Sequence, residues 1–344
     1  MGAPKVLVIT GDHFCEDPEK PGGAYGPEDL RLHRRMVEAM GSLDHWDVEI
    51  ANRHAGLLER LRTAPPDLVV NFCDTGYMNR VELELHLPAY CELLGIPYTG
   101  ATPAAIATCY DKAIVRAAAQ ALGIPVPGEL GLCAGTLVAP RDTAYPVLIK
   151  PNKSDGSFGI TQHALVRDAS DARSYLAWLA REVPGRDLLV QEYLPGPEYG
   201  VALIGNPETG LEALTPLEVD FSGLGSGLSP ILAYESKVDP SSPYYTRIEY
   251  RAARLSGDER DRVIADAKRL FSRLGLQDYA RFDLRRGGDG EIKLIEVNPN
   301  PAWDPEAKLA LMAGFSGLEY PMLLRRIIET AWERSRRRAA RARA

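Results

Sequence analysis

The polar residues with the clearest chemical pattern lie in the segment 279–298. A glycine-rich turn in its middle predicts a β-hairpin, and alternation along each strand puts every second side chain on the same face. One face would therefore carry Arg281, Asp283, Glu296 and Asn298. Carboxylate and amide oxygens suit Mg²⁺ that is shared with substrate phosphates, and an arginine beside them can hold developing negative charge. The pattern predicts a site for phosphoryl chemistry.

The turn also predicts the register of this hairpin. Residue 286 should pair with 291, 283 with 294 and 281 with 296, and the opposite face should carry Phe282, Leu284, Ile295 and Val297. The alternative is an amphipathic hairpin whose solvent face happens to be charged. Pro299-Asn300-Pro301 follows directly and forces an irregular exit from the strand, which favours a functional site over a surface hairpin.

Two lysines are candidate phosphate ligands. Lys150 ends an apolar strand and precedes a loop with Gly156, Ser157 and Gly159. An ammonium group and backbone N–H donors at such a loop can bind phosphate oxygens. The loop is not of the G-x-x-x-x-G-K-[ST] type, and an ordinary turn is the alternative. Lys112, at the start of a helix, is either a second phosphate ligand or an ordinary solvated lysine.

A proline-rich bend at 191–199 could meet an adenine ring. Its backbone would offer donors and acceptors, Glu198 would reach ribose hydroxyls, and Tyr193 would pack in the core. A plain linker is the alternative. The glycine-rich stretch 223–227 lacks the flanking strand and helix of a dinucleotide fingerprint, so it suggests a mobile flap, with Lys237 downstream.

Other chemistries find little support in the sequence. The six histidines show no metal-ligand spacing, and no Ser-centred nucleophile elbow is present. Five scattered cysteines fit neither a zinc site nor a disulfide framework, so a reducing cytoplasm is the expected location. The formal net charge of −7 argues against a nucleic-acid partner. The absence of a long apolar run argues against a membrane span or signal sequence.

The chain's length of 344 residues predicts two or three compact units, and a hydrophobic content of 45% indicates a folded protein. Strands at 5–10, 48–51 and 67–72 alternate with helices, the first at 27–40, which predicts a parallel α/β unit. A further helix is expected at 79–94 and another at 112–122. Strands and a helix between 145 and 205 predict a small α+β unit. The basic end 333–344 is expected to be a frayed helix or a disordered arm.

Taken in order, these motifs resemble the ATP-grasp superfamily and, within it, the D-alanine–D-alanine ligase-like branch of carboxylate–amine ligases. The similar landmarks are Gly95–Gly100, Asp111-Lys112, Gly123–Pro127, Lys150-Pro151, Leu194 with Gly196–Glu198, Arg281–Asp283 and Glu296–Asn298. The resemblance covers roughly residues 65–330. It implies an α/β and α+β fold with an N-terminal α/β subdomain and two α+β subdomains that grip ATP. The expected division is 1–108, 109–205 and 206–332, followed by the basic tail 333–344.

The resemblance also implies a role for each candidate residue. Phosphates would be bound by Lys112 and Lys150 with the loop residues Gly156 and Ser157, and adenine and ribose by Gln191, Tyr193, Leu194 and Glu198. Two Mg²⁺ ions, or Mn²⁺ in their place, would be held by Asp283, Glu296 and Asn298. Lys237 and Arg281 would flank the transferred phosphoryl group, and the Ala302 N–H would join Arg281 at the oxyanion. Residues 219–245 would form a lid that excludes water.

The substrate side departs from the family pattern. Relatives follow the metal-binding Asn with a glycine and then Ser-Leu, where this chain has Ala302 and Ala307-Lys308. The serine helps to seat the second amino acid's carboxylate in those ligases, and Lys308 could supply charge by another route. The glutamate expected to meet the first substrate's ammonium has no clean match, and its candidates are Glu16, Glu19 and Glu28.

We therefore expect an ATP- and Mg²⁺-dependent ligase that joins a carboxylate to an amine through an acyl phosphate, with small amino acids or related acids as substrates. A specialised ligase is favoured over a true cell-wall D-alanine–D-alanine ligase, because the acceptor-binding residues differ. The remaining alternatives are a non-catalytic ATP-binding regulatory module and a hydrolytic ATPase. Relatives are often dimers, so the resemblance implies a homodimer as one form of assembly. No nucleic-acid or membrane partner is expected.

Overall fold

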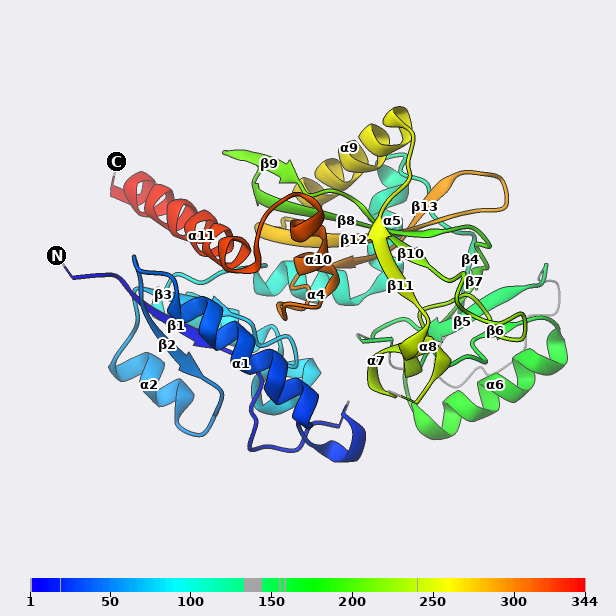
Figure 1. Cartoon of the computed structure of the whole chain (residues 1–344), viewed down its shortest axis with the longest axis horizontal. Helices are drawn as coiled ribbons and strands as arrows, with labels where there is room; N and C mark the ends of the chain where they lie inside the picture. The colour runs from blue at the N-terminus through cyan, green and yellow to red at the C-terminus, as the bar shows by residue number, and fades with distance from the viewer. Residues whose placement is uncertain are drawn as a thin grey trace.

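Three β-sheets organise the chain in the computed structural model, which describes residues 2–18, 20–132, 144–154, 156–157, 159–239 and 241–343. The N-terminal sheet and the third sheet lie on opposite sides of the molecule, and the large second sheet lies between and above them (Figure 1). One sheet is parallel and the other two are antiparallel. The predicted combination of α/β and α+β units is confirmed.

The N-terminal sheet has the strand order β2-β1-β3. Its strands are β1 (Lys5–Ile9), β2 (Asp47–Ala51) and β3 (Leu68–Asn71), and its helices are α1 (Pro27–Gly41), α2 (Leu57–Thr63) and α3 (His86–Leu94). All four residues of β3 are buried, and so are the last four of β1, as expected for parallel strands covered on both faces. Proline at the first helical position of α1 presets the backbone angle that the helix needs.

The predicted helix over 79–94 is wrong in its first half. Two short 3₁₀ turns, Tyr77–Asn79 and Val81–Leu83, precede α3. Asn79 has a φ of 54°, and its side chain accepts from the Asp12 N–H at 2.8 Å and donates to the Asp12 carbonyl at 2.7 Å. This contact with the loop after β1 overrides the local helical pattern, because tertiary bonds outweigh a weak propensity.

The second sheet is the largest and has the order β11-β10-β8-β12-β13, with β9 beside β8. Its strands are β8 (Glu198–Asn206), β9 (Gly210–Ala213), β10 (Leu217–Asp220), β11 (Glu249–Ala252), β12 (Asp278–Arg286) and β13 (Ile292–Asn298). Helices cover both faces: α4 (Pro103–Tyr110), α5 (Lys112–Ala121) and α9 (Gly257–Arg273) on one, α10 (Lys308–Phe315) and α11 (Tyr320–Arg343) on the other. Alternate side chains of β8 enter these two cores, Val201 and Leu203 on one side and Ala202 and Ile204 on the other.

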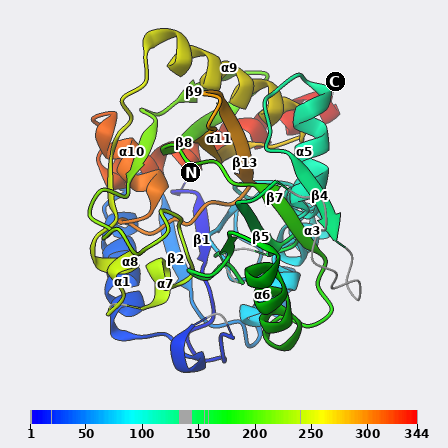
Figure 2. The same cartoon turned by 90° about the vertical axis from the view of Figure 1, so that its right-hand side faces the viewer.

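The third sheet has the order β4-β7-β5-β6. Its strands are β4 (Glu129–Leu132), β5 (Val147–Pro151), β6 (Leu165–Val166) and β7 (Leu188–Glu192), and its long helix is α6 (Ala169–Glu182). Two short helices, α7 (Glu235–Val238) and α8 (Pro243–Thr246), follow later in the chain. Tyr244 of α8 belongs to the same apolar core as Ile149 of β5 and Leu176 of α6. Figure 2 shows α6 below β5, and α7 and α8 on the same side of the view as α1.

The division of the chain into subdomains stays a prediction, but the sheets do not follow its boundaries. Strand β8 begins at Glu198 and pairs along its length with β12, so it belongs to the second sheet although 109–205 was expected to form the central unit. Helix α5 likewise packs against β13 and α9. The central segment therefore contributes elements to two of the sheets.

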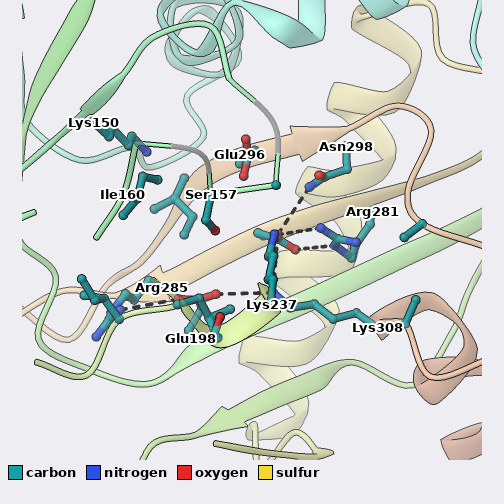
Figure 3. A pocket seen from close by; sticks show the side chains of 18 of the residues that line it. Lys150, Ser157, Ile160, Glu198, Lys237, Arg281, Arg285, Glu296, Asn298 and Lys308 are labelled. Carbon is teal, nitrogen blue, oxygen red and sulfur yellow. Dashed lines mark hydrogen bonds and ion pairs between the residues drawn. The ribbon is translucent and has the colours of Figure 1, made fainter. Parts of the chain in front are cut away.

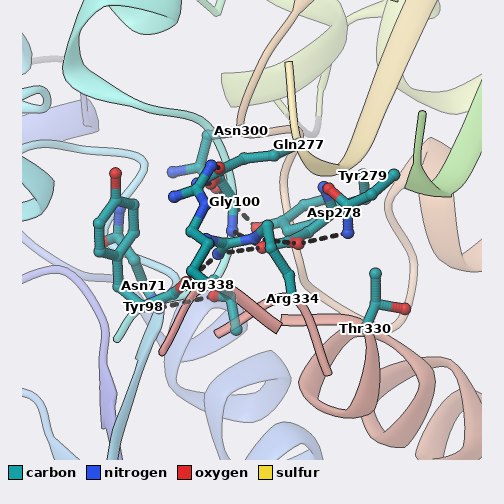
Figure 4. A network of polar contacts seen from close by, with 12 residues as sticks. Asn71, Tyr98, Gly100, Gln277, Asp278, Tyr279, Asn300, Thr330, Arg334 and Arg338 are labelled. Atoms are coloured by element: carbon teal, nitrogen blue, oxygen red, sulfur yellow. Dashed lines mark hydrogen bonds and ion pairs between the residues drawn. The ribbon is translucent and has the colours of Figure 1, made fainter. Parts of the chain in front are cut away.

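Of the two expectations for the basic C-terminal end, the disordered arm is wrong for the residues up to Arg343, which belong to helix α11. Arg334 is 9% exposed and donates from Nε and Nη2 to the two carboxylate oxygens of Asp278, each at 2.8 Å. Its Nη2 also reaches the Tyr98 carbonyl at 2.6 Å (Figure 4). Tyr98 bridges to Val69 of β3, so α11 ties the first sheet to the second.

Candidate active site

The hairpin of β12 and β13 forms with a register that differs from the predicted one. Asp283 pairs with Glu296 and Arg281 with Asn298, and a bulge between Asp283 and Leu284 shifts the pairing next to the turn by one residue. The predicted pairing is therefore wrong by two residues at the open end. An error of two residues leaves each side chain on its expected face, because side chains alternate with a period of two.

The bulge does change one predicted position. Ile295, expected on the apolar face, lines the cavity together with Glu296, while Leu294 joins the apolar core in its place. A bulge of this kind places an additional residue in one strand and redirects its side chain. The polar face itself is confirmed, since its four expected members all line one cavity, namely Arg281, Asp283, Glu296 and Asn298.

This cavity has a volume of about 530 Å³. Its walls include residues of α1 in the N-terminal unit, of β5 in the third sheet and of β12 in the second sheet. Its walls include nearly all of the residues that the sequence singled out: Glu28, Lys112, Lys150, Gly156, Ser157, Gln191, Tyr193, Leu194, Glu198, Lys237, Arg281, Asp283, Glu296, Asn298, Ala302 and Lys308. Figure 3 shows Lys150, Ser157 and Glu296 on one side of the cavity and Glu198, Arg285 and Lys308 on the other. Their individual roles stay predictions.

Glu16 is the candidate that the structure does not bring to the cavity. It is exposed and its side chain lies beside Gly23, in the loop after β1. Glu19 lies outside the described residues. Of the three candidates for contact with a substrate ammonium, Glu28 alone lines the cavity among the described residues, from the first turn of α1.

Asp283 is at the centre of a group of cationic and amide donors. Arg281 donates from Nε to Oδ1 at 2.8 Å and from Nη2 to Oδ2 at 3.1 Å, and Asn298 Nδ2 lies 3.4 Å from Oδ2. Lys308 Nζ lies 3.6 Å from the same Oδ2. Burial alone would raise the pKa of Asp283, but the charges of Arg281 and Lys308 hold it well below its ordinary value. The carboxylate is therefore ionised at neutral pH.

Glu296 faces a second pair of cations. Lys112 Nζ lies 3.0 Å from Glu296 Oε1 and donates to the Ser154 carbonyl at 2.6 Å. Burial would raise the pKa of Glu296, but Lys112 and Lys150 lower it. Burial and the nearby charge of Lys112 reduce the pKa of Lys150 to about 8. Two close ammonium groups favour an anionic ligand, because each destabilises the other's charge when no anion lies between them.

Local hydrogen bonds hold these two lysines together. Asp111 caps α5 by accepting from the Ile114 N–H at 3.1 Å, and its Oδ1 also accepts from Asn152 Nδ2 at 3.0 Å. Asn152 Oδ1 in turn accepts from the Ala113 N–H at 3.0 Å. The start of α5, which carries Lys112, is thereby fixed to the end of β5, which carries Lys150.

The bend after β7 forms another wall. Gln191 is buried, its side chain donates to Glu129 Oε2 at 2.6 Å, and its backbone is held by pairing with β4 and β5. Glu198 is also buried, with Arg285 Nη1 and Lys308 Nζ each 3.5 Å from its carboxylate. Tyr193 packs partly against the core of the third sheet, as expected for a core residue.

Sequence reasoning missed Arg285, which lines the cavity beside Glu198. Its guanidinium group lies over the Tyr193 ring at 5.4 Å and donates from Nε to the Gly196 carbonyl at 3.1 Å. The signal was available, because the alternation that selects Arg281 and Asp283 also selects Arg285. Buried guanidinium groups that lie over aromatic rings are suited to fixing the shape of a binding wall.

Another part of the cavity wall is acidic, and apart from Glu28 its residues were also missed. Asp29 lies on α1, and Asp304 and Glu306 lie in the segment after β13. Arg31 donates to Glu306 at 2.9 Å, and Lys20 to Asp29 at 2.7 Å. Burial raises the pKa of Asp304. No spacing in the sequence connects these positions, since α1 and the later segment meet only in the folded chain.

Trp303 anchors the later segment on the N-terminal sheet. Its ring stacks on Phe72 with centroids 5.7 Å apart, and its carbonyl accepts from Tyr320 at 2.8 Å. Ala302 and Lys308, on either side of this anchor, both line the cavity. The irregular exit that Pro299 and Pro301 predicted thus returns the chain to the site.

Two antiparallel sheets beside one cavity, with lysines, an arginine and ionised carboxylates in its walls, define the ATP-grasp class of ligases. A family model described as the D-ala D-ala ligase C-terminus matches residues 136–329. The chain belongs to this family. It is an ATP-dependent ligase that forms carbon–nitrogen bonds.

Several known proteins are similar to this chain. The uncharacterized protein y4sG of Sinorhizobium fredii (strain NBRC 101917 / NGR234) is 30% identical over 316 residues, which cover 88% of each chain. The vancomycin B-type resistance protein VanB of Enterococcus faecalis (strain ATCC 700802 / V583) is 31% identical over 243 residues, which cover 71% of this chain and 68% of VanB.

Solved structures show the same fold. The D-alanine–D-alanine ligase from Bacillus anthracis complexed with ATP matches with a TM-score of 0.72 at 19% identity, covering 98% of this chain and 100% of that one. The VanG D-Ala:D-Ser ligase from Enterococcus faecalis matches with a TM-score of 0.69 at 19% identity, covering 96% of this chain and 100% of that one.

Proposed function

We propose that this ligase uses ATP to activate the carboxylate of a small amino acid or related acid, and that it then joins the acyl group to an amine. The observation that carries the proposal is the convergence of Arg281, Asp283 and Glu296 with two buried lysines on one cavity. A free carboxylate is a poor electrophile, so attack of its oxygen on the γ-phosphorus, with loss of ADP, gives an acyl phosphate. The amine then attacks the acyl carbon, and phosphate leaves as the amide forms.

The nucleotide occupies the part of the cavity between the second and third sheets. Lys112 and Lys150 bind its phosphates, supported by the loop at Gly156 and Ser157. Adenine and ribose lie along the bend, against Gln191, Tyr193, Leu194 and Glu198. The direction of the Lys150 pKa supports this assignment, because an anion between two close ammonium groups relieves their repulsion.

The donor set on the hairpin fits Mg²⁺. Asp283 and Glu296 have lowered pKa values and Asn298 adds an amide oxygen, which gives the hard oxygen ligands that this ion prefers. Asp283, Glu296 and Asn298 would hold the ion, and oxygens of the nucleotide phosphates would supply further ligands. When bound, Mg²⁺ neutralises phosphate charge.

Residues of the chain perform the remaining steps. Arg281, fixed by Asp283, stabilises negative charge on the transferred phosphoryl group and later on the tetrahedral oxyanion, where the Ala302 N–H is a second donor. Lys237 of α7 lies at the same cavity. Its segment is joined to the phosphate loop through the Tyr234 N–H, which donates to the Ile160 carbonyl at 2.7 Å. This segment, within 219–245, keeps water from the acyl phosphate.

The substrates are small amino acids or related acids, in a pocket that differs from that of a cell-wall D-alanine–D-alanine ligase. Glu28 meets the ammonium of the first substrate at the cavity wall. The Ser-Leu pair that seats the second carboxylate in relatives is Ala307-Lys308 here, so that pocket has lost a hydroxyl donor. The VanG relative is a D-Ala:D-Ser ligase, which supports variation of the acceptor within this fold.

The test is ADP release by the full-length protein with ATP, Mg²⁺ and a panel of amino acids, with products identified by mass spectrometry. We expect ADP release that depends on a carboxylate and an amine, with one amide formed per ADP. Product from D-alanine alone at full rate would identify the cell-wall activity instead. ADP without an amide would indicate a hydrolase, and nucleotide binding without turnover would overturn the ligase assignment. Mass spectrometry also separates ligation from cyclisation.

No helix within the described part of the chain has the length and apolar character needed to cross a membrane. We place the enzyme in the cytoplasm, as the scattered cysteines suggest. A homodimer is the assembly that the resemblance implies.

A further inference from the structure

Lys308 is a cation at a position where the family pattern has an apolar leucine. It begins helix α10, and its side chain is only 13% exposed. Its Nζ lies 3.5 Å from Glu198 Oε1 and 3.6 Å from Asp283 Oδ2. A lysine is rarely buried unless its charge has a partner, and here the partners are a candidate metal ligand and a candidate ribose ligand.

The contact of Lys308 with Asp283 is made to Oδ2. Oδ1 of Asp283 accepts from Arg281 Nε at 2.8 Å, while Oδ2 accepts from Arg281 Nη2 at 3.1 Å and also lies 3.4 Å from Asn298 Nδ2 and 3.6 Å from Lys308 Nζ. A divalent cation on Oδ2 would lie close to the Lys308 ammonium, and like charges at a few ångströms repel strongly in a site that is shielded from water. The ammonium and a metal ion therefore compete for the same carboxylate oxygen.

Lys112 makes a similar contact with Glu296, but its positive charge is already part of the pattern that the family resemblance implies. It belongs to the Asp111-Lys112 pair that resembles a landmark of the family, and the resemblance implies that this lysine binds phosphate. It also lies on the side of Glu296 next to Lys150, as part of the lysine pair. Lys308 has no counterpart in that pattern, so it adds one positive charge to the metal end of the cavity.

We propose that the Lys308 ammonium takes the place of one metal ion at Asp283, so that this enzyme binds its nucleotide with one Mg²⁺, at Glu296 and Asn298, instead of two. The inference depends on the proposed nucleotide site. It goes beyond that proposal because it assigns to Lys308 the positive charge that a second metal ion would otherwise supply. A fixed ammonium needs no supply of free metal, so the enzyme binds nucleotide at lower Mg²⁺ than a ligase that must collect two ions.

The test counts metal ions with a non-hydrolysable ATP analogue and Mn²⁺ as the spectroscopic probe. Wild type should bind about one Mn²⁺ per nucleotide, and Lys308→Met about two, with exchange coupling between the two ions visible by electron paramagnetic resonance. At limiting Mg²⁺ the variant should bind the analogue about tenfold more weakly, and excess Mg²⁺ should restore its affinity. Lys268→Met, which removes a lysine from α9 outside the cavity, is the control and should match wild type.

Two coupled Mn²⁺ ions in wild type would overturn the inference, and so would a loss of affinity in Lys308→Met that excess Mg²⁺ does not restore, since that is the result of a merely structural lysine. Lys308→Gln keeps a polar side chain at this position and gives the same comparison if the methionine variant fails to fold. Failure of the proposed function is distinct: wild type would not bind the analogue at all. Amide formation with two bound ions would reject this inference alone.

Discussion

Strand β12 carries two buried carboxylates with different environments, Asp278 at its start and Asp283 further along. Asp278 is fully buried, and both of its oxygens accept from Arg334 at 2.8 Å. The Asn206 side chain, at 3.1 Å, and the Gly100 N–H, at 3.0 Å, also bond to it (Figure 4). Every donor around Asp278 comes from a different part of the chain, so this network assembles the fold.

Asp283 has a comparable arginine partner, but it faces the cavity and its other donors are more distant. Arg281 is close, whereas Asn298 and Lys308 lie at 3.4 and 3.6 Å (Figure 3). These longer contacts leave one side of Asp283 open to the cavity, whereas the donors around Asp278 enclose it. The comparison teaches that the geometry around a buried carboxylate, more than its burial, separates a structural ion pair from a binding site.

The largest expected effect is a loss of turnover after a substitution in the cavity, beside Asp283. Glu296→Gln removes the negative charge opposite Asp283 while keeping the size of the side chain. We expect turnover to fall by at least about a thousandfold, since an electrostatic contact made to the reacting groups is lost. The variant should still fold, with some loss of stability, because Lys112 loses its carboxylate partner at 3.0 Å but keeps its bond to the Ser154 carbonyl. Amino-acid-stimulated ADP release and thermal unfolding measure the two effects.

The matched control is Asp289→Asn, which removes a carboxylate from the turn of the same hairpin. Asp289 is exposed and does not line the cavity, and its buried partner Lys293 has a second partner in Glu192 at 3.0 Å. Removal of the Asp289 carboxylate should leave turnover within about twofold of wild type, since no group in the cavity loses a contact. Retention of a tenth or more of the activity in Glu296→Gln would reject the metal-ligand assignment.

The next largest effect is expected for the hydrogen-bonded network around Asp278. Arg334→Met leaves Asp278 buried without its cation, which should lower the free energy of unfolding by about 3–5 kcal/mol. Denaturant titration measures this loss. The turnover of protein that remains folded should be unchanged, because Arg334 lies outside the cavity. A loss of turnover with unchanged stability would contradict the distinction between the two carboxylates.

Arg337→Met is the control for this variant. Arg337 lies less than a turn further along α11 and pairs with Glu333 in an exposed position. Its removal should cost less than about 0.5 kcal/mol, because solvent screens an exposed pair. The difference between the two arginine variants then measures the buried network alone.

The sequence predicted the functional network well because local periodicity determines which side chains share a face of a strand. Arg281, Asp283, Glu296 and Asn298 were placed on one face although the register was wrong by two residues, since a period of two tolerates that error. The parallel N-terminal unit was predicted for the same reason: apolar strands that alternate with helices have few other arrangements.

The structural network could not be predicted, because its partners are far apart in the chain. Arg334 belongs to the basic C-terminal end, and no neighbouring residue in the sequence indicates its contact with Asp278. The bulge at Ile295 and the approach of Asp304 to α1 depend on tertiary packing in the same way. Local pattern identifies which residues face a site, whereas long-range contacts determine what else surrounds it.

The smallest expected effect is a pH dependence of nucleotide binding in the cavity. The pKa of Lys150 is lowered to about 8 by burial and by Lys112, so its ammonium is present below pH 8 and is lost above it. A bound phosphate needs the charged form, so binding above pH 8 requires the uptake of a proton. Nucleotide affinity should therefore fall about tenfold between pH 7 and pH 9, as measured by isothermal titration calorimetry.

Lys150→Arg tests the cause, because a guanidinium group stays charged throughout this range. The variant should lose the decline above pH 8, whatever its affinity at pH 7. Proton uptake on binding, seen as a dependence of the binding enthalpy on the buffer, should accompany the decline in wild type and disappear in the variant. An equal decline in both proteins would assign the titration to another group, and it would remove Lys150 from the phosphate contacts without affecting the hydrogen-bonded network around Asp278.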